Sequence, residues 1–274
     1  MGGYNFGLRG HDIANDFVNM CEKAKENKIN LLQFALGKTC NDINFDIVGY
    51  DKNISTQISN RLHENMLNVA VLGCYINPVE IDIKSKELQL TRFENFISYC
   101  KDFNARVIGT ETGQKNSIEE THSNETYVEF LNSMVPLVQK AQDKQVQIGI
   151  EPVWQLTIYS VDILEKMIKD IASSNISVIL DISNLMHNEI FDRQDYVINS
   201  AFEKFGDRIS TIHLKDYYVL DGIKSFAPTG LGNLNIDLIF KNIEFMDKKP
   251  DIILDELPLS LYHEAVERLD SKLG

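Results

Sequence analysis

The chain has 274 residues, of which 43% are hydrophobic, and its formal net charge at pH 7 is −13. Proteins that grip nucleic acid through its phosphates need clustered Lys and Arg, and anionic membranes also attract cations, so neither is expected as a partner. The chain lacks an apolar run of about 18 residues, an apolar N-terminal segment like that of a signal peptide, and any CxxC pair among its four cysteines, so we expect a cytoplasmic protein with reduced thiols and no membrane span.

Eight short apolar runs stand out along the chain. Several are rich in Val and Ile and show no alternation with polar residues, which is typical of strands buried on both faces of a parallel sheet. In chain order they cover residues 4–8, 30–36, 69–76, 106–109, 146–150, 177–180, 209–214 and 252–254.

Stretches with helical spacing of apolar residues lie between these runs. The first is expected to begin at Asp12 as its cap, and a later one follows Ser160, a good residue for starting a helix. Another ends before Gly206, a good residue for ending one. The predicted helices cover residues 13–26, 88–103, 127–141, 161–171, 196–205, 238–246 and 262–269.

The order of elements predicts an α/β protein with eight βα units. The strand starts advance by about 35 residues, which matches one such unit with its loops. Eight units over this length predict a single (β/α)8 TIM barrel domain, residues 1–274, with a parallel eight-stranded core. The alternative is an open doubly wound sheet, which usually has a GxGxxG loop after its first strand. The corresponding segment here reads "LRGHDIAND" and has no such loop.

Ionisable residues follow four consecutive predicted strands. They are Glu151 in "IGIEP", Asp181 in "VILDISN", His213 in "IHLKD", and the pair Asp255 and Glu256 in "IILDELP". One acid at a strand end is ordinary, but in a barrel these ends converge at one rim. Carboxylates so close raise one another's pKa, and a divalent cation removes that penalty. Oxygen ligands with one imidazole suit Mn²⁺, Co²⁺, Mg²⁺ or Zn²⁺.

These four motifs, with "GTETG" after the fourth strand and "PTGLG" after the seventh, resemble the xylose isomerase-like TIM barrel superfamily. That superfamily contains sugar and sugar-phosphate isomerases and epimerases, inosose dehydratases and apurinic endonucleases (AP endonuclease family 2). The resemblance implies one divalent metal ion and an isomerase or epimerase that transfers a proton through a metal-stabilised enediolate. Glu151 and Glu256 would be the two catalytic carboxylates, one on each face of the sugar.

The ligand from the eighth strand is ambiguous. By analogy with "IGIE" and "VILD" it is Asp255, the acid directly after the apolar triplet. By residue type, and by the proline that follows in related barrels, it is Glu256. Neighbouring residues on a strand point to opposite faces, so only one is expected to bind the metal, and we favour Glu256.

Residues that differ from the family's motifs reduce the number of reactions this chain is expected to catalyse. The DNA-repair members need extra histidines at the second and third strand ends, and this chain has "QFA" and "CYIN" there. Epimerases often carry a histidine three residues after the sixth-strand Asp181, and this chain has Asn184, which can bind a substrate hydroxyl but carries no proton. A dehydratase acting on a cyclitol or keto-sugar is therefore the alternative, followed by an inactive sugar-binding barrel.

Five more residues near strand ends are candidates for substrate binding. Glu111 in "GTETG" either binds a hydroxyl, acts in acid–base chemistry or pairs with a base. Arg9 and His11 either line the mouth of the barrel or cap the first helix. Trp154 either stacks on a sugar face or packs at the rim. Lys215 contacts a phosphate or an enediolate oxygen, unless it pairs with a local acid. Four further histidines are expected at the surface.

The stretch "STIHLKDYY" concentrates three of the ionisable groups. On an extended strand Lys215 faces the same side as His213, whereas Asp216 points the other way and orients a neighbour. Arg9, Lys215 and the loop at residues 230–232 are sufficient donors for one phosphate. The sequence therefore leaves open whether the sugar is phosphorylated, and a homo-oligomer is possible.

Overall fold

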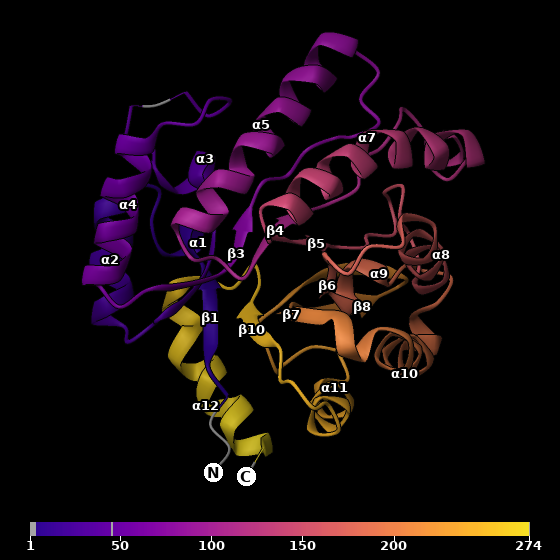
Figure 1. Cartoon of the computed structure of the whole chain (residues 1–274). Helices are drawn as coiled ribbons and strands as arrows, with labels where there is room; N and C mark the ends of the chain where they lie inside the picture. The colour runs from indigo at the N-terminus through magenta and orange to yellow at the C-terminus, as the bar shows by residue number, and fades with distance from the viewer. Residues whose placement is uncertain (1–3, 45, 274) are drawn as a thin grey trace.

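The computed structural model describes residues 4–44 and 46–273, so the first three residues of the N-terminal segment lie outside it. Eight parallel strands close into a barrel in the order β1-β10-β7-β6-β5-β4-β3-β2, which confirms the predicted (β/α)8 TIM barrel (Figure 1). Each of the eight predicted apolar runs overlaps one barrel strand, with differences of a few residues at the ends. The strands are β1 (Phe6–Arg9), β2 (Leu31–Phe34), β3 (Asn68–Gly73), β4 (Val107–Thr110), β5 (Gln147–Ile150), β6 (Ile176–Leu180), β7 (Ile209–Leu214) and β10 (Asp251–Leu254).

Helices surround the strands (Figure 1). The longer ones are α2 (Phe17–Glu26), α4 (Lys52–Glu64), α5 (Ile83–Asp102), α7 (Asn124–Asp143), α8 (Val161–Ile171), α10 (Gln194–Phe205), α11 (Ile236–Glu244) and α12 (Tyr262–Leu273). Single turns are α1 (Gly10–Ile13), α3 (Leu36–Thr39), α6 (Ile118–Thr121) and α9 (Ile182–Leu185), and 3-10 turns cover Phe191–Arg193, Gly206–Arg208 and Leu259–Leu261. The last helix closes onto the first strand, because the Tyr262 hydroxyl donates to the Phe6 carbonyl at 2.8 Å.

The helix predictions need three corrections. The first predicted helix is broken into α1 and α2, and the cap of α2 is Asp16, whereas Asp12 binds Arg9. Helix α4 was not predicted, because its apolar residues are sparse, although Asp51 caps its first turn. Helix α10 ends at Phe205, before Gly206, as predicted, but Gly206 is not left-handed, because its φ is −41° and the chain continues into a 3-10 turn. The cap at Ser160 is confirmed.

A hairpin that was also missed follows β7 directly. Its strands are β8 (Asp216–Leu220) and β9 (Ile223–Ala227), which pair antiparallel outside the barrel. The turn consists of Asp221 and Gly222, both with positive φ. Asp-Gly between two apolar segments is a strong hairpin signal, so the sequence held the information.

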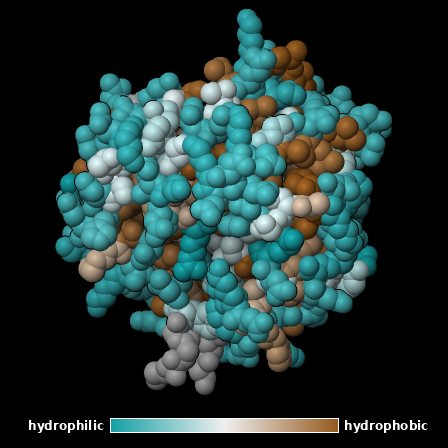
Figure 2. All heavy atoms as spheres, in the orientation of Figure 1, coloured by the Kyte–Doolittle hydropathy of each residue, from teal (hydrophilic) through white to brown (hydrophobic). Residues whose placement is uncertain are grey.

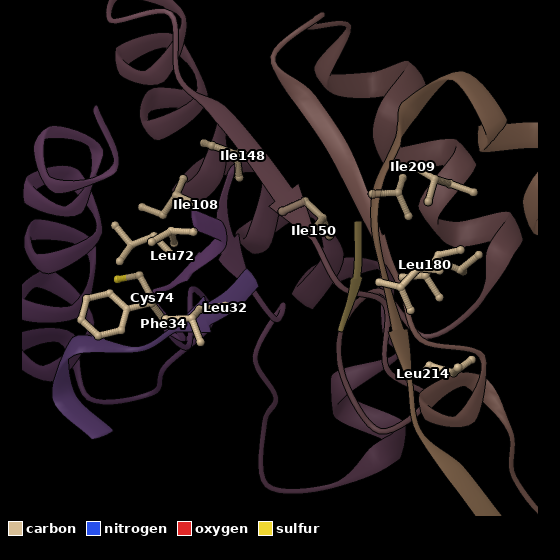
Figure 3. Packing of buried hydrophobic residues seen from close by; sticks show 14 of the residues in the cluster. Leu32, Phe34, Leu72, Cys74, Ile108, Ile148, Ile150, Leu180, Ile209 and Leu214 are labelled. Carbon is tan, nitrogen blue, oxygen red and sulfur yellow. The ribbon is translucent and has the colours of Figure 1, made fainter. Parts of the chain in front are cut away.

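Alternation along the strands divides the core into two layers. The barrel interior is filled by a small cluster: Leu31, Ala70, Val71, Val107, Ile179 and Ile253. Gly109 lies in the same space, where an added Cβ would be 2.4 Å from a Val71 methyl carbon. The alternate residues pack outward against the helices, as Leu72, Ile108 and Ile148 do in Figure 3. Because inward positions alternate, the residue two positions after an interior residue, such as Asp255 after Ile253, points inward at the rim, where chemistry is expected.

The face of the molecule shown in Figure 2 is mainly hydrophilic, and its hydrophobic residues gather mostly in the upper right part. Exposed apolar side chains include Ile83 and Leu88 on α5 and Val128 and Val135 on α7. In the described residues, no helix is both long and apolar enough to cross a bilayer. All four cysteines are buried and free.

Candidate metal and substrate site

Polar side chains occupy the inward positions at or just beyond the carboxyl ends of all eight barrel strands. In chain order they are Arg9, Gln33, Tyr75, Glu111, Glu151, Asp181, His213 and Asp255. All except Asp181 line a cavity of about 240 Å³. His11, Asn184, Lys215 and Glu256 line the same cavity, so the structure brings together every predicted site residue except Asp181 and Trp154 on its walls.

Asp181 lies in the buried centre of the site. One potential ligand atom each from Glu151, Asp181 and His213 lies within 4.8 Å of the other two. His213 Nδ1 is 3.2 Å from Glu151 Oε1. Asn184 joins two members of the cluster, because its side-chain amide donates to Glu151 at 2.9 Å and its backbone N–H donates to Asp181 Oδ1 at 3.1 Å.

The cluster has unused ligand atoms. Asp181 Oδ2 and His213 Nε2 are buried and find no hydrogen-bond partner among the described residues. A buried polar atom left unpaired is costly, so such atoms generally mark an ion, a water molecule or a ligand. Carboxylate oxygens with one imidazole nitrogen are suitable ligands for a hard or borderline divalent cation. The cluster therefore fits a single divalent metal ion.

The protonation of the cluster reflects its crowding. Burial, with repulsion from Glu151 and Asp255, raises the pKa of Asp181 to about 8. Burial opposes a charge on His213, but the adjacent Glu151 carboxylate outweighs it and raises the pKa of His213 to about 9. The same contact holds the pKa of Glu151 below its ordinary value despite complete burial. Without a cation, the cluster therefore retains protons that a metal ion would displace.

The two acids at the eighth strand face different surroundings. Asp255 comes two residues after the interior residue Ile253, and its side chain is only 8% exposed. Burial raises its pKa, and His213 and Arg9 offset part of that effect. The side chain of Glu256 is 43% exposed and binds the Lys215 ammonium at 2.6 Å. Glu256 has a φ of 54°, a left-handed turn that directs it away from the strand's alternation.

Arg9 and Lys215 are both engaged by carboxylates. The guanidinium of Arg9 donates to both oxygens of Asp12, at 2.7 and 2.9 Å, and lies 3.5 Å from Asp255. Lys215 also approaches the Asn184 side-chain oxygen at 3.5 Å. For Lys215 both alternatives from the sequence apply, because it lines the cavity while it pairs with a local acid. Arg9 likewise lines the cavity and is the N-cap residue of α1, although its side chain makes no capping hydrogen bond.

Glu111 is the carboxylate best suited to exchange a proton near neutral pH. Burial, with repulsion from Glu151, raises its pKa to about 7. Its side chain lines the cavity. A group with such a pKa is an effective general acid or base at physiological pH.

Four residues of the cavity wall were not among the predicted site residues: Val153 and the polar residues Gln33, Lys38 and Tyr75. The side-chain amide of Gln33 donates a short hydrogen bond to the Tyr75 hydroxyl, and the Lys38 ammonium lies 5.5 Å from the centre of the Tyr75 ring. A signal for Gln33 existed, because it is the one polar residue in the buried run "LLQFAL". Lys38 lies within the single turn α3 beyond the strand, where the sequence pattern does not indicate which way a side chain points.

Trp154 lies outside the cavity. Its ring stacks on His187 with centroids 4.0 Å apart and meets His122 edge-on at 5.4 Å. These two histidines are half-buried, which corrects their expected surface position. The ring lines a separate groove with Tyr196. Trp154 supports the site through its backbone N–H, which donates to the Asn184 carbonyl at 2.9 Å.

Asp216 binds the glycine-containing loop after the hairpin. Its buried carboxylate accepts backbone N–H bonds from Tyr217, Gly230, Gly232 and Leu234, at 2.8 to 3.0 Å. The expectation that the loop at residues 230–232 donates to a substrate phosphate is therefore wrong for the two glycine amides, because an internal carboxylate already occupies them.

The fold and this cluster define a class: closed (β/α)8 barrels with a carboxylate and histidine site at the carboxyl ends of the strands. A family model described as "Xylose isomerase-like TIM barrel" matches residues 21–272. The chain belongs to this family, which confirms the resemblance seen in its motifs. A search of curated proteins found no match.

Solved structures share the fold at low sequence identity. A D-tagatose 3-epimerase-like protein superposes with a TM-score of 0.79 and 14% identity, over 98% of this chain and 97% of that chain. A xylose isomerase-like TIM barrel protein from Mycobacterium smegmatis, in complex with magnesium, has a TM-score of 0.71 and 14% identity, over 99% and 98%. The probable 3-DHS dehydratase AsbF from Bacillus anthracis has a TM-score of 0.71 and 12% identity, over 97% and 98%.

Proposed function

We propose that this protein is a divalent-metal-dependent isomerase or epimerase that transfers a proton next to the carbonyl of a sugar-sized substrate. The observation that carries the proposal is the buried cluster of Glu151, Asp181 and His213, with two ligand atoms unpaired beside a polar cavity. The volume of about 240 Å³ is below the range of about 300–1,000 Å³ usual for drug-sized ligands, which favours a monosaccharide over a larger substrate.

The cluster residues would hold the ion, with Asp255 as the fourth ligand. Its inward position and low exposure support this choice over Glu256, which pairs with Lys215. A divalent ion, when bound, withdraws electron density from substrate oxygens and so acidifies a C–H bond next to a carbonyl. The proposed ion is one of Mn²⁺, Co²⁺, Zn²⁺ and Mg²⁺.

The carboxylates of the cavity would move the proton. Hydrogen bonds with Asn184 and His213 hold the Glu151 carboxylate, so its position is fixed before substrate binds. Glu111, with a pKa of about 7, can accept or return a proton at physiological pH. Glu256 stays a predicted second catalytic group, and its ion pair places the Lys215 ammonium where a substrate oxygen can accept from it.

A dehydratase is the second candidate, favoured by the residue after the sixth strand. Asn184 donates to Glu151 and has no acidic proton to transfer, so it cannot return a proton to the substrate carbon. A dehydratase needs the first proton abstraction and then an acid to protonate the departing hydroxyl. Glu111 suits the second task because of its raised pKa.

Metal analysis and deuterium exchange test the proposal together. We expect one divalent ion per chain in wild type and loss of that ion in His213→Ala, with His263→Ala on the exposed face of α12 as the control. NMR of a ketose and cyclitol panel in D₂O should show exchange at one carbon without water loss for an isomerase. Water loss would select the dehydratase. Wild-type exchange that survives complete metal removal would refute the proposal.

A further inference from the structure

The cavity has a second half that faces the metal cluster across the barrel. Resting on the proposed function, we propose that this half is a hydroxyl-binding subsite formed by His11, Gln33, Lys38 and Tyr75, and that the substrate is consequently an unphosphorylated sugar. The cluster residues come from β5, β6 and β7, and the subsite residues follow β1, β2 and β3. In the closed strand order, β2 lies opposite β6. A monosaccharide held at the cluster would therefore extend its non-reacting end into the subsite.

Polar atoms of this subsite lack partners. Gln33 is only 3% exposed; one end of its amide binds the Tyr75 hydroxyl, and Oε1 finds no hydrogen-bond partner among the described residues. His11 Nδ1 is likewise buried and without a partner there. Burial and the adjacent Arg9 lower the pKa of His11 to about 4, so its ring is neutral at physiological pH. A neutral imidazole and an amide match hydroxyl groups, which both donate and accept.

The groups that would bind a phosphate are already committed to protein carboxylates. Arg9 donates two hydrogen bonds to Asp12, and Lys215 forms an ion pair with Glu256. The amides of the loop after β9 are bound by Asp216. Freeing Arg9 or the loop amides would leave the Asp12 or Asp216 carboxylate unpaired in a largely buried place, which is costly, whereas Glu256, the partner of Lys215, is 43% exposed.

Lys38 is the remaining cavity cation, and no carboxylate of the described residues forms an ion pair with it. One ammonium does not neutralise a phosphate dianion. Five carboxylates lie on the cavity wall or beneath it, against three Lys and Arg side chains, one of which, Arg9, already pairs with Asp12 outside the wall. The site is therefore rich in acids. A neutral sugar adds no charge to it, whereas a phosphate would add two negative charges to a confined space.

Calorimetric titration of matched sugar pairs tests the subsite. The probes are D-tagatose, D-fructose and L-ribulose, each compared with its terminal phosphate ester, added to protein preloaded with Mn²⁺. We expect measurable binding of at least one free ketose and at least tenfold weaker binding of its ester. Gln33→Leu should weaken the free ketose about three- to tenfold through the lost hydrogen bonds. Gln147→Leu, the same change at the opposite end of the barrel, should leave the binding unchanged.

The Mn²⁺ titration that precedes each sugar titration separates the two proposals. Failure to bind any of Mn²⁺, Co²⁺, Zn²⁺ and Mg²⁺ refutes the proposed metal enzyme, while equal Mn²⁺ affinity in Gln33→Leu shows that the variant retains its fold. The subsite is refuted by an ester that binds as tightly as its free ketose and loses that binding in Lys38→Met. It is refuted as well when every free ketose fails to bind, or when Gln33→Leu leaves ketose affinity within twofold of wild type.

Discussion

Replacing Asp181 by Asn should stabilise the metal-free protein at pH 8 but abolish its stabilisation by metal. In the folded, metal-free protein the pKa of Asp181 is about 8, against an ordinary value of 3.8. Because the folded-state pKa is raised, ionisation of this group destabilises the fold. The penalty is absent below about pH 4, grows as the pH rises toward 8, and is complete above that.

The size of the effect follows from the same shift. At pH 7, keeping Asp181 protonated costs about 4 kcal/mol relative to the unfolded chain, at about 1.36 kcal/mol per pH unit. Asn avoids that cost and can still accept the Asn184 backbone N–H through its oxygen. Its NH₂ would lie where Oδ2 now has no partner, a loss of about 1–3 kcal/mol. The net gain is about 1–3 kcal/mol, or roughly 2–6 °C in Tm at about 2 °C per kcal/mol for a domain of this size.

Thermal unfolding followed by circular dichroism checks this, in EDTA and in excess Mn²⁺, at pH 4.5 and pH 8. The expected pattern is a higher Tm than wild type in EDTA at pH 8, no gain at pH 4.5, and little response to Mn²⁺. Wild type should gain about 2.7 kcal/mol at a metal concentration 100 times its Kd. The exposed Asp207→Asn is the control. A lower Tm for Asp181→Asn in EDTA at pH 8, or a Mn²⁺ response equal to that of wild type, would refute the reasoning.

Four further outcomes are expected. Metal affinity should rise with pH below about 8, and calorimetry at pH 7 in buffers of different ionisation heat should report release of about two protons, because Asp181 and the cluster histidine are protonated without metal. Asp255→Asn should weaken Mn²⁺ binding at least tenfold and Glu256→Gln less than threefold; the reverse order would restore Glu256 as the ligand. Asp216→Ala should lower the free energy of unfolding in urea by at least about 3 kcal/mol, since buried backbone donors lose their acceptor. Gly109→Ala should cost about 1–3 kcal/mol through overpacking, whereas Gly206→Ala, with nothing within 4 Å of the added carbon, should be nearly neutral.

The barrel and much of its rim could be predicted from sequence because they depend on local patterns. A strand buried on both faces needs an unbroken apolar run, and such runs mark all eight strands, including those ending before Glu151 and Asp181. A charged residue directly after such a run is also a local feature. Once the runs are recognised as barrel strands, their ends must share one rim. Helix α4 was not predicted because its few apolar residues give only a weak helical pattern.

The contacts of the rim residues depended on the tertiary structure. Asp255 and Glu256 are adjacent in sequence, yet one left-handed residue directs them to different surroundings, and strand alternation does not extend through such a turn. The phosphate donors seen in the sequence proved to be engaged by Asp12, Glu256 and Asp216.

The sequence by itself determined the barrel, the rim and the acids and histidine of the cluster, because periodicity and strand ends are local properties of the chain. Only the tertiary structure decided which atoms remain unpaired, Asp181 Oδ2, His213 Nε2 and Gln33 Oε1 among them. Hydrogen bonds and ion pairs form between residues distant in sequence. Which polar atoms find a partner and which do not is therefore decided only when the strands close into a barrel.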